Sequence, residues 1–394
     1  MSSPAPVRPR PVHRAADLLA AYLPGSFYYS SARGSLLADG VHARVHAATG
    51  SRAAAATEAL EAARDAGIGD PIVAGAIGFR PDAPSSLVVP AVVRRAGAPA
   101  AGGAAPVVAG DWTVTPKPAP EVYTTAVRRA LDLIGEGELR KVVLARCLEL
   151  TASAPVSAPA LLARLVHADP AAHAFAVDVS APGDPAPRTV LGASPELLVS
   201  RHGSGCVANP LAGSRPRVGD EAEDARRVTE LLASEKDRAE HALVTAQVAE
   251  VLGRFCDDLD VPAEPVVLGT PTMWHLSTRI SGRMAGDGVS SLALAEALHP
   301  TPAVCGVPVD RARDAIAVLE PEDRGYYAGL VGWTGADGDG EWVVTIRSAE
   351  VCNRTVRVFA GAGVVAGSDP EAELAETSAK SRTVLRALGL EDAE

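Results

Sequence analysis

The sequence has 394 residues, of which 47% are hydrophobic and 22% are charged, and its formal net charge is −11. This is enough apolar material for one large hydrophobic core or two smaller ones. The acidic balance argues against a nucleic acid or an anionic membrane surface as partner, since both select a basic face. No apolar run approaches the roughly 20 residues that a helix needs to span a bilayer, so no membrane partner is expected.

The N-terminus and the cysteines indicate a compartment. The first residues contain prolines and scattered arginines but no apolar stretch of roughly 7–15 residues before a cleavage site, so a secretory signal is not expected. The five cysteines are far apart in the sequence, odd in number, and form no CxxC pair. Structural disulfides and a zinc site are therefore not expected, and a cytoplasmic location is the interpretation.

The N-terminal part of the chain has weaker patterns than the rest. Residues 1–15 are interpreted as a disordered lead, and residues 16–115 contain short alternating runs with little helix. This second part is expected to complete the sheets of the part that follows. The stretch 96–106, rich in Ala, Gly and Pro, indicates a loop before the longer catalytic part at 116–394.

From residue 120 onward, helix and strand patterns are clear. In chain order they predict an amphipathic helix at 121–137, a strand at 141–150, a strand, tight turn and strand at 188–201, a long helical region at 221–255 with one break, strands at 326–333, 341–351 and 355–365, and a last helix at 368–390. Ser368 or Asp369 can cap the last helix, and Pro370 suits its first turn. Adjacent strands with helices between them indicate the α+β class, with antiparallel sheets covered by helices.

Two helices carry acidic residues at helical spacing. Glu373, Glu376 and Lys380 project from one face of the last helix, and Asp237 and Glu240 project together from the long helical region. If the two faces meet, each pair of carboxylates near 4 Å repels by roughly 4 kcal/mol, so a cation is required. Oxygen ligands without Cys or clustered His select a hard ion such as Mg²⁺. The alternative is that both are ordinary solvated helix faces, paired with neighbouring cations.

Two residues are candidates for acid–base chemistry. Glu196 lies in a polar break between apolar strands, where partial desolvation would raise its pKa toward that of a general acid. Lys141 opens a buried strand, where desolvation or nearby cations would make it a base. The alternatives are a strand-end acid that faces water and a strand-edge lysine in solvent.

Several residues could meet an anion. The turn 210–216 and the AGAG run at 360–363 could offer backbone N–H groups, although neither has the spacing of a nucleotide-binding loop. Arg347 is predicted to point from its strand as a bidentate clamp for a carboxylate. His275 could be a ligand or an acid, and a satisfied core histidine is the alternative.

A series of motifs in a fixed order decides between these alternatives. The series comprises GELRKVVLAR, LGASPELLV, PLAGSRPR, SEKDRAEH, HLSTRI, LHPTPAVCG, YYAGLVGW, VVTIRSAEV and AGAGVVAGSDPEAELAETSAK. It resembles the chorismate-utilising enzymes, which include isochorismate synthases, salicylate synthases, anthranilate synthase component one and aminodeoxychorismate synthase. The resemblance runs from about residue 120 to the C-terminus. It implies a four-layer α/β/β/α fold with two orthogonally packed antiparallel sheets.

The resemblance also implies roles for particular residues, with chorismate as the small-molecule substrate and Mg²⁺ as the cofactor. Glu240 and Glu376 resemble direct Mg²⁺ ligands, and Asp237 and Glu373 resemble residues that hold coordinated waters. The remaining positions resemble substrate contacts: Arg347, Tyr327 and the Gly361 backbone for the enolpyruvyl carboxylate, and Gly213, Ser214, His275, Ala303 and Lys380 around the ring and its carboxylate.

Lys141 and Ala303 indicate the branch of the family. The ammonia-using members carry Gln where this chain has Lys141, and water needs a base as it attacks, so Lys141 favours water addition at C2. Glu196 would protonate the leaving C4 hydroxyl. The aminodeoxychorismate branch has a lysine where this chain has Ala212. Salicylate synthases typically carry Thr where this chain has Ala303, which favours release of isochorismate.

The expectation is therefore an isochorismate synthase. A salicylate synthase and a catalytically inactive subunit are the alternatives, and the intact set of acid, base and four carboxylates argues against the second. The compact length favours the 2,3-dihydroxybenzoate siderophore route over the menaquinone route, which stays open. Family members are often monomers, so a monomer is expected.

Overall fold

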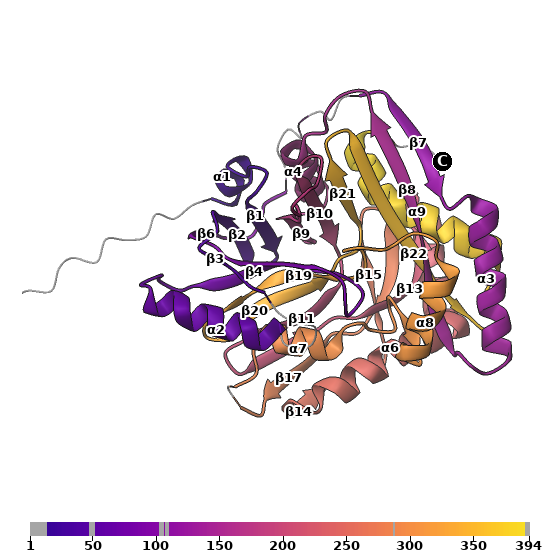
Figure 1. The fold of residues 1–394 in the computed structure, drawn as a ribbon. Coiled ribbons are helices and arrows are strands. Elements are labelled where there is room, and N and C mark those ends of the chain that lie inside the picture. The colour runs from indigo at the N-terminus through magenta and orange to yellow at the C-terminus, as the bar shows by residue number, and fades with distance from the viewer. Residues whose placement is uncertain (1–13, 47–51, 102–105, 107–109, 287, 391–394) are drawn as a thin grey trace, which may run out of the picture.

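The computed structural model describes residues 14–46, 52–101, 106, 110–286 and 288–390 (Figure 1). Its helices are α1 (Ala15–Ala20), α2 (Arg52–Asp65), α3 (Pro120–Gly135), α4 (Ala158–Ala168), α5 (Glu221–Ala233), α6 (Glu235–Leu252), α7 (Ser291–Leu298), α8 (Val309–Leu319) and α9 (Pro370–Leu388). No helix within these residues is long and apolar enough to cross a membrane. The predicted disordered lead falls outside the described residues, except for positions 14 and 15.

The strands form three antiparallel sheets. They are β1 (Phe27–Ser31), β2 (Gly34–Asp39), β3 (Ala43–Arg44), β4 (Ile72–Ile77), β5 (Ser85–Val89), β6 (Val92–Ala96), β7 (Trp112–Lys117), β8 (Lys141–Ala152), β9 (His173–Asp178), β10 (Arg188–Ser194), β11 (Leu197–His202), β12 (Gly205–Ala208), β13 (Leu211–Pro216), β14 (Cys256–Asp260), β15 (Val266–Gly269), β16 (Met273–Ser277), β17 (Ile280–Met284), β18 (Gly306–Val307), β19 (Leu330–Gly335), β20 (Gly340–Val344), β21 (Ser348–Cys352) and β22 (Thr355–Val365). The ten-stranded sheet has the order β18-β8-β22-β21-β10-β9-β1-β2-β6, with β7 also paired to β8. The nine-stranded sheet has the order β14-β17-β12-β11-β20-β19-β4-β5-β3, and β13-β16-β15 form a small third sheet. The α+β class with antiparallel sheets is confirmed, and the small sheet was not predicted.

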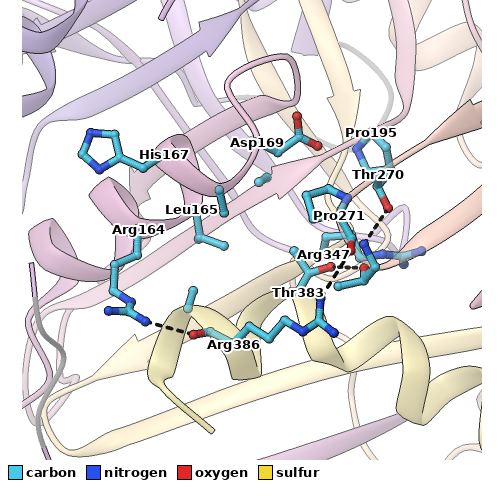
Figure 2. Close-up of a pocket in the computed structure, with 14 residues that line it drawn as sticks. Arg164, Leu165, His167, Asp169, Pro195, Thr270, Pro271, Arg347, Thr383 and Arg386 are labelled. Carbon is cyan, nitrogen blue, oxygen red and sulfur yellow. Dashed lines mark hydrogen bonds between the residues drawn. The ribbon is translucent and has the colours of Figure 1, made fainter. Parts of the chain in front are cut away.

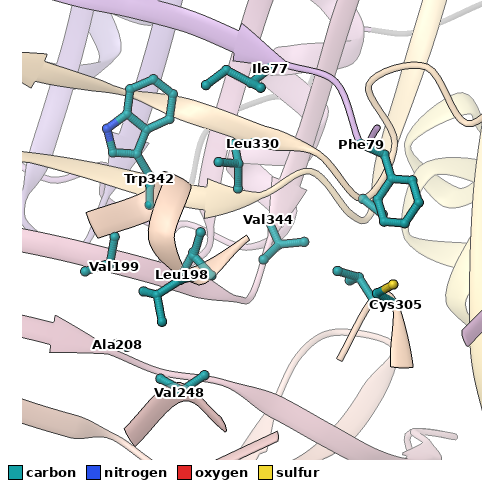
Figure 3. Close-up of a cluster of buried hydrophobic side chains, with 14 of the residues drawn as sticks. Ile77, Phe79, Leu198, Val199, Ala208, Val248, Cys305, Leu330, Trp342 and Val344 are labelled. Carbon is teal, nitrogen blue, oxygen red and sulfur yellow. The ribbon is translucent and has the colours of Figure 1, made fainter. Parts of the chain in front are cut away.

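The apolar clusters give the order of the layers. One cluster lies between the two large sheets, where Tyr29 and Phe175 of the ten-stranded sheet meet Ile72, Val331 and Val343 of the other. A second packs the outer face of the ten-stranded sheet against α1, α4 and α9. The third, partly drawn in Figure 3, includes residues of the nine-stranded sheet, α2, α6 and α7. The order is thus helix, sheet, sheet, helix, as the resemblance implied.

The N-terminal part contributes to both large sheets. Strands β1, β2 and β6 lie in the ten-stranded sheet, and β3, β4 and β5 lie in the nine-stranded sheet. The predicted boundary between residues 115 and 116 falls within β7, and the division into parts stays a prediction. The expectation of little helix there was wrong, because α2 spans 14 residues. Its sequence RAAAATEALEAARD has high helix propensity but weak contrast between its faces, so periodicity did not reveal it.

Two segments pass from one large sheet to the other. β10 and β11 belong to different sheets, so Pro195 and Glu196 form a crossover and not the predicted tight turn. β20 and β21 also belong to different sheets, so the predicted strand at 341–351 is interrupted at 345–347. Periodicity predicts strands but not the sheet that each strand joins, which depends on distant partners. The predicted strand at 326–333 begins later, at Leu330.

Side-chain caps mark where the two acidic helices begin. Ser234 ends α5 and caps α6, accepting a hydrogen bond of 3.2 Å from the Asp237 N–H, so the predicted break is confirmed. Asp369 caps α9 by accepting a hydrogen bond of 2.8 Å from the Ala372 N–H. Gly389 ends α9 with a φ of 80°, a conformation that favours glycine.

Candidate active site

The predicted site residues gather around one small cavity. Its lining includes, from the predicted set, Glu196, Gly213, Ser214, Glu240, His275, Ala303, Tyr327, Arg347, Gly361, Glu376 and Lys380. Lys141 contacts Glu240 from outside this lining, and Asp237 and Glu373 lie one helical turn before Glu240 and Glu376. The lining also includes Val143, Val304 and Gly363, which the sequence did not single out. Each lies in one of the ordered motifs, but only Gly363 also belongs to a run that was predicted to meet an anion, the AGAG run at 360–363.

Lys141 is buried at the start of β8, so it is not the solvent-facing lysine of the alternative reading. Its side chain is 0% exposed, and its Nζ lies 2.8 Å from Glu240 Oε1 on α6. Gly363 on the neighbouring strand β22 makes room for this ion pair. A Cβ at Gly363 would lie 2.3 Å from Glu240 Oε1 and 3.1 Å from Lys141 Cε. Glycine is needed there because two side chains approach the backbone closely.

Each of the four predicted metal-binding carboxylates has its own cationic partner. The ion pairs are Asp237–Arg215 at 2.6 Å, Glu240–Lys141 at 2.8 Å, Glu373–Lys236 at 2.9 Å and Glu376–Lys380 at 2.5 Å. The carboxylates of Asp237 and Glu373 are 6% and 3% exposed, so the alternative of solvated faces is wrong for them. The chain thus neutralises its own buried acids.

The electrostatics of α9 follow from these pairs. Burial raises the pKa of Glu373, and the nearby Glu376 carboxylate raises it further. Burial also raises the pKa of Glu376, but the Lys380 ammonium outweighs it, and the net shift is downward. Glu376 therefore stays a carboxylate. Lys380 Nζ also donates a hydrogen bond of 3.0 Å to the Gly361 carbonyl on β22.

The donor set fits Mg²⁺ in kind, since it consists of carboxylate oxygens on two helices with neither Cys nor clustered His. The Lys236 ammonium lies close enough to Glu373, Glu240 and Glu376 to be stabilised by all three, so a cation already occupies this region. Among the described residues, no group of three or more His, Cys, Asp or Glu side chains is arranged to hold an ion. Metal binding would therefore require these ion pairs to rearrange.

Glu196 has the environment of a general acid. The residue is 3% exposed and lies at the first crossover between the sheets. Burial raises its pKa to about 7, although a hydrogen bond from the Leu211 backbone and the charges of Lys141, Arg347 and Lys380 oppose the shift. Its Oε1 has no hydrogen-bond partner among the described residues. A buried carboxyl group with one unpartnered oxygen at a cavity can hold a proton for a ligand.

Arg347 lies at the second crossover, beside the first. The two crossovers are joined by backbone hydrogen bonds from Val344 N–H to the Glu196 carbonyl, 3.2 Å, and from Ala193 N–H to the Arg347 carbonyl, 3.1 Å. Arg347 has a φ of 50°, which is uncommon for a residue with a side chain and typical of functional sites. The residue is 7% exposed, and its Nε has no partner among the described residues.

His275 is a neutral neighbour of Arg347. Burial and the positive charge of Arg347 hold the pKa of His275 well below its usual range. Arg347 Nη2 lies 3.3 Å from His275 Nε2. Because a guanidinium only donates, Nε2 accepts and the imidazole proton belongs on Nδ1. His275 is thus suited to orient Arg347 and not to act as an acid.

The other predicted contacts complete the wall. Tyr327 stacks on Phe359 with ring centroids 5.3 Å apart, and burial raises its pKa to about 12, so it stays a phenol. Gly213 has a φ of 76°, and a Cβ there would lie 3.0 Å from Asp237 Cβ. The close contact between this turn and α6 therefore requires glycine.

The cavity is small as it stands. Its volume of about 50 Å³ has room for few water molecules. A larger cavity of about 300 Å³ shares only Pro195 and Arg347 with it and is otherwise lined by residues such as Arg164, His167 and Arg386 (Figure 2). The predicted site and this larger cavity are therefore distinct, and they share only these two residues.

Comparison with known proteins identifies relatives. The sequence profile of the chorismate binding enzymes matches residues 105–389. The isochorismate synthase DhbC of Bacillus subtilis (strain 168) is 47% identical over 393 residues, covering 96% of this chain and 97% of the relative. The crystal structure of DhbC from Bacillus anthracis, whose description assigns it as a 2,3-dihydroxybenzoate-specific isochorismate synthase, has a TM-score of 0.91, 44% identity, and coverage of 95% of this chain and 100% of that one. The menaquinone-specific isochorismate synthase MenF of Escherichia coli has a TM-score of 0.81, 27% identity, and coverage of 95% and 91%.

Proposed function

Because the chain belongs to the family of chorismate-binding enzymes, we propose that it is an isochorismate synthase that serves 2,3-dihydroxybenzoate siderophore synthesis. The observation that carries the proposal is the pair Lys141 and Glu196. Both side chains are buried, Glu196 in the lining of the cavity and Lys141 just outside it, and they are close enough for the ammonium to lower the pKa of the carboxyl group. The similarity to a 2,3-dihydroxybenzoate-specific relative along almost the whole chain supports the siderophore route.

Cationic groups bind the two carboxylates of chorismate. The Arg347 guanidinium, oriented by His275, holds the enolpyruvyl carboxylate by paired hydrogen bonds. Lys380 and the turn at Ser214 face the ring. Glu240 and Glu376 would hold Mg²⁺ directly, and Asp237 and Glu373 through water. When bound, the ion neutralises the ring carboxylate, which lets an acidic protein hold a dianion.

The reaction exchanges one hydroxyl group for another. Lys141 acts as the neutral amine, because an ammonium has no lone pair, and its Nζ accepts a proton from water as the water oxygen bonds to C2 of the ring. The double bonds shift, and the bond from C4 to its hydroxyl oxygen breaks. Glu196 donates its proton to that oxygen, which leaves as water. One water enters and one leaves, and the proton that Lys141 gains replaces the one that Glu196 loses, so isochorismate is an isomer of chorismate and the enzyme is regenerated. The pKa of about 7 for Glu196 supports a protonated acid near neutral pH.

Lys141 also argues for water over ammonia as the nucleophile, and Ala303 argues for release of isochorismate over elimination of pyruvate. Chorismate as substrate, Mg²⁺ as cofactor, a monomer as the active form and the cytoplasm as compartment are parts of the same proposal. All five cysteines are free, in keeping with a reducing compartment.

Product analysis tests the proposal. The purified protein is incubated with chorismate and Mg²⁺, and the products are separated by chromatography, with the Lys141→Ala protein as the inactive control. We expect isochorismate as the only product. Salicylate together with pyruvate would support a salicylate synthase instead. Anthranilate formed in the presence of ammonium, or no conversion at all, would contradict both.

A further inference from the structure

The edge of β8 that faces away from β22 is incomplete beside the cavity. β18 pairs with β8 only at Lys141 and Val142, and β7 pairs with it only from Cys147 onward. In the gap, the Val143 carbonyl and the Ala145 N–H point to the open edge. Buried backbone groups without partners are costly, so this gap needs another source of hydrogen bonds.

A buried ion pair fills the gap. Arg324 Nη2 donates a hydrogen bond of 2.8 Å to the Val143 carbonyl, and Glu320 Oε1 accepts one of 2.7 Å from the Ala145 N–H. The two side chains are also joined to each other, with Arg324 Nε 2.8 Å from Glu320 Oε2 and Nη2 2.5 Å from Oε1. Their side chains are only 3% and 6% exposed. One donor and one acceptor thus take the place of a strand.

Arg324 also reaches two other parts of the cavity wall, one through its guanidinium and one through its backbone carbonyl. Arg324 Nη1 donates a hydrogen bond of 2.8 Å to the carbonyl of Val304, which lines the cavity next to Ala303. The Arg324 carbonyl accepts a bond of 2.9 Å from the Tyr327 N–H. The guanidinium also lies over the Phe79 ring, 4.3 Å from its centroid.

From these contacts we propose that Glu320 and Arg324 are positioning residues for the reaction. They hold the strand that begins with Lys141, the segment that carries Ala303, and Tyr327 at fixed distances from one another. Neither side chain lines the cavity, so they act through the backbone of the residues that do. This inference rests on the proposed function, since it concerns the placement of the proposed base and of the wall at Ala303.

Stability alone does not explain the pair. A buried ion pair contributes little net stability compared with apolar residues of similar size, because desolvation offsets the attraction. What apolar side chains could not supply is the set of hydrogen bonds to three backbone groups at Val143, Ala145 and Val304. The pair therefore fixes the positions of these backbone groups. Small displacements of reacting groups strongly reduce the reaction rate.

The test compares three variants with a matched control. Arg324→Lys keeps the charge but loses the planar fork, Glu320→Gln loses the charge, and the Glu320→Met, Arg324→Met double variant replaces the pair by apolar side chains. Arg254→Lys is the control, since Arg254 forms an exposed i,i+4 pair with Glu250 at 2.7 Å. The readouts are kcat and KM for chorismate, the product ratio, Mg²⁺ affinity by calorimetry, thermal stability, and hydrogen exchange of the peptide that contains Ala145.

We expect kcat to fall about 10- to 100-fold in Arg324→Lys, with KM and Mg²⁺ affinity changed by less than about threefold. The Ala145 peptide should exchange faster in all three variants, and the control should match the wild type. We expect the double variant to remain folded with low kcat, which separates positioning from stability. Unchanged kcat in folded variants, or a loss of kcat only in proportion to unfolding, would overturn the proposal. If the wild type converts no chorismate, the proposed function fails, while hydrogen exchange still reports whether the pair holds the β8 edge.

Discussion

Lys141 and Glu240 are 99 positions apart in the sequence, and their side chains meet as a buried ion pair with 2.8 Å between Nζ and Oε1. Lys141 is the proposed base, and Glu240 is a proposed metal ligand. The two sites that appear separate in the sequence are therefore coupled, because one carboxylate oxygen cannot hold the ammonium and the metal ion equally well. On the proposed assignment of the metal ligands, Mg²⁺ and Lys141 would compete for Glu240.

Replacing Lys141 should change both activity and metal affinity. In Lys141→Met, we expect isochorismate formation to fall at least about 100-fold, because a general base contributes roughly 10²–10⁴ in rate. We also expect Mg²⁺ to bind about tenfold more tightly, which corresponds to roughly 1.4 kcal/mol, since its competitor is gone. Calorimetry without substrate measures the second effect. Lys117→Met is the control, since Lys117 forms an ion pair with Glu149 away from the cavity. Wild-type turnover in Lys141→Met would refute the assignment of Lys141 as the base.

Removing the charge of Glu376 should weaken the metal site. In Glu376→Gln, we expect the Mg²⁺ concentration for half-maximal activity to rise at least about tenfold, because a neutral amide is a poorer ligand for a hard ion. Glu371→Gln on the same helix is the control, since Glu371 is 64% exposed and pairs with Arg128. A Mg²⁺ titration identical to that of the wild type would remove Glu376 from the set of ligands.

The raised pKa of Glu196 predicts a pH dependence. The acid must be protonated to act, so kcat should fall about tenfold per pH unit above pH of about 7. Between the ordinary pKa of 4.5 and about 7, the native protein keeps this proton while the unfolded chain releases it. Glu196 therefore lowers the free energy of unfolding as the pH rises through this window.

Glu196→Gln separates the two effects of this group. We expect the variant to lose activity at all pH values and to be more stable than the wild type at pH 8, with the advantage disappearing at pH 4. Chemical denaturation at both pH values measures this difference in the free energy of unfolding. A stability difference that does not depend on pH would show that Glu196 is not the group with the raised pKa.

Gly363 should not tolerate a side chain. In Gly363→Ala the new Cβ would overlap the Glu240 carboxylate, which lies at the flexible end of its side chain. The fold can therefore adjust at a cost of about 1–3 kcal/mol, but the pair with Lys141 must shift. We expect a folded protein with kcat reduced at least about tenfold. Gly97→Ala is the control because no atom of the described residues lies within 4 Å of its Cβ position. Equal kcat in both variants would contradict the steric argument.

The acidic helices and the strand of the base were predictable because their signals are local. Three-residue spacing in a helix puts Glu373 and Glu376 on one face wherever the helix packs, and the caps at Ser234 and Asp369 act within four residues. The long apolar pattern after Lys141 predicted a strand for the same reason. The ordered motifs added the family and its fold.

Other features were not predictable because they depend on contacts between distant parts of the chain. The two predicted strand segments around Glu196 and Arg347 each cross from one sheet to the other, and hydrogen bonds between the crossovers bring these residues together. The ion pair at Glu320 and Arg324 replaces a missing strand, which no local pattern reveals.

The sequence by itself determined which residue types and helix faces are assigned to the proposed chemistry, since periodicity, caps and motif order are properties of neighbouring residues. Only the tertiary structure decided the electrostatic state of the site. Burial and approach across the fold pair Lys141 with Glu240 and raise the pKa of Glu196 to about 7. Both effects arise from desolvation and from charges that distant segments bring within a few ångströms.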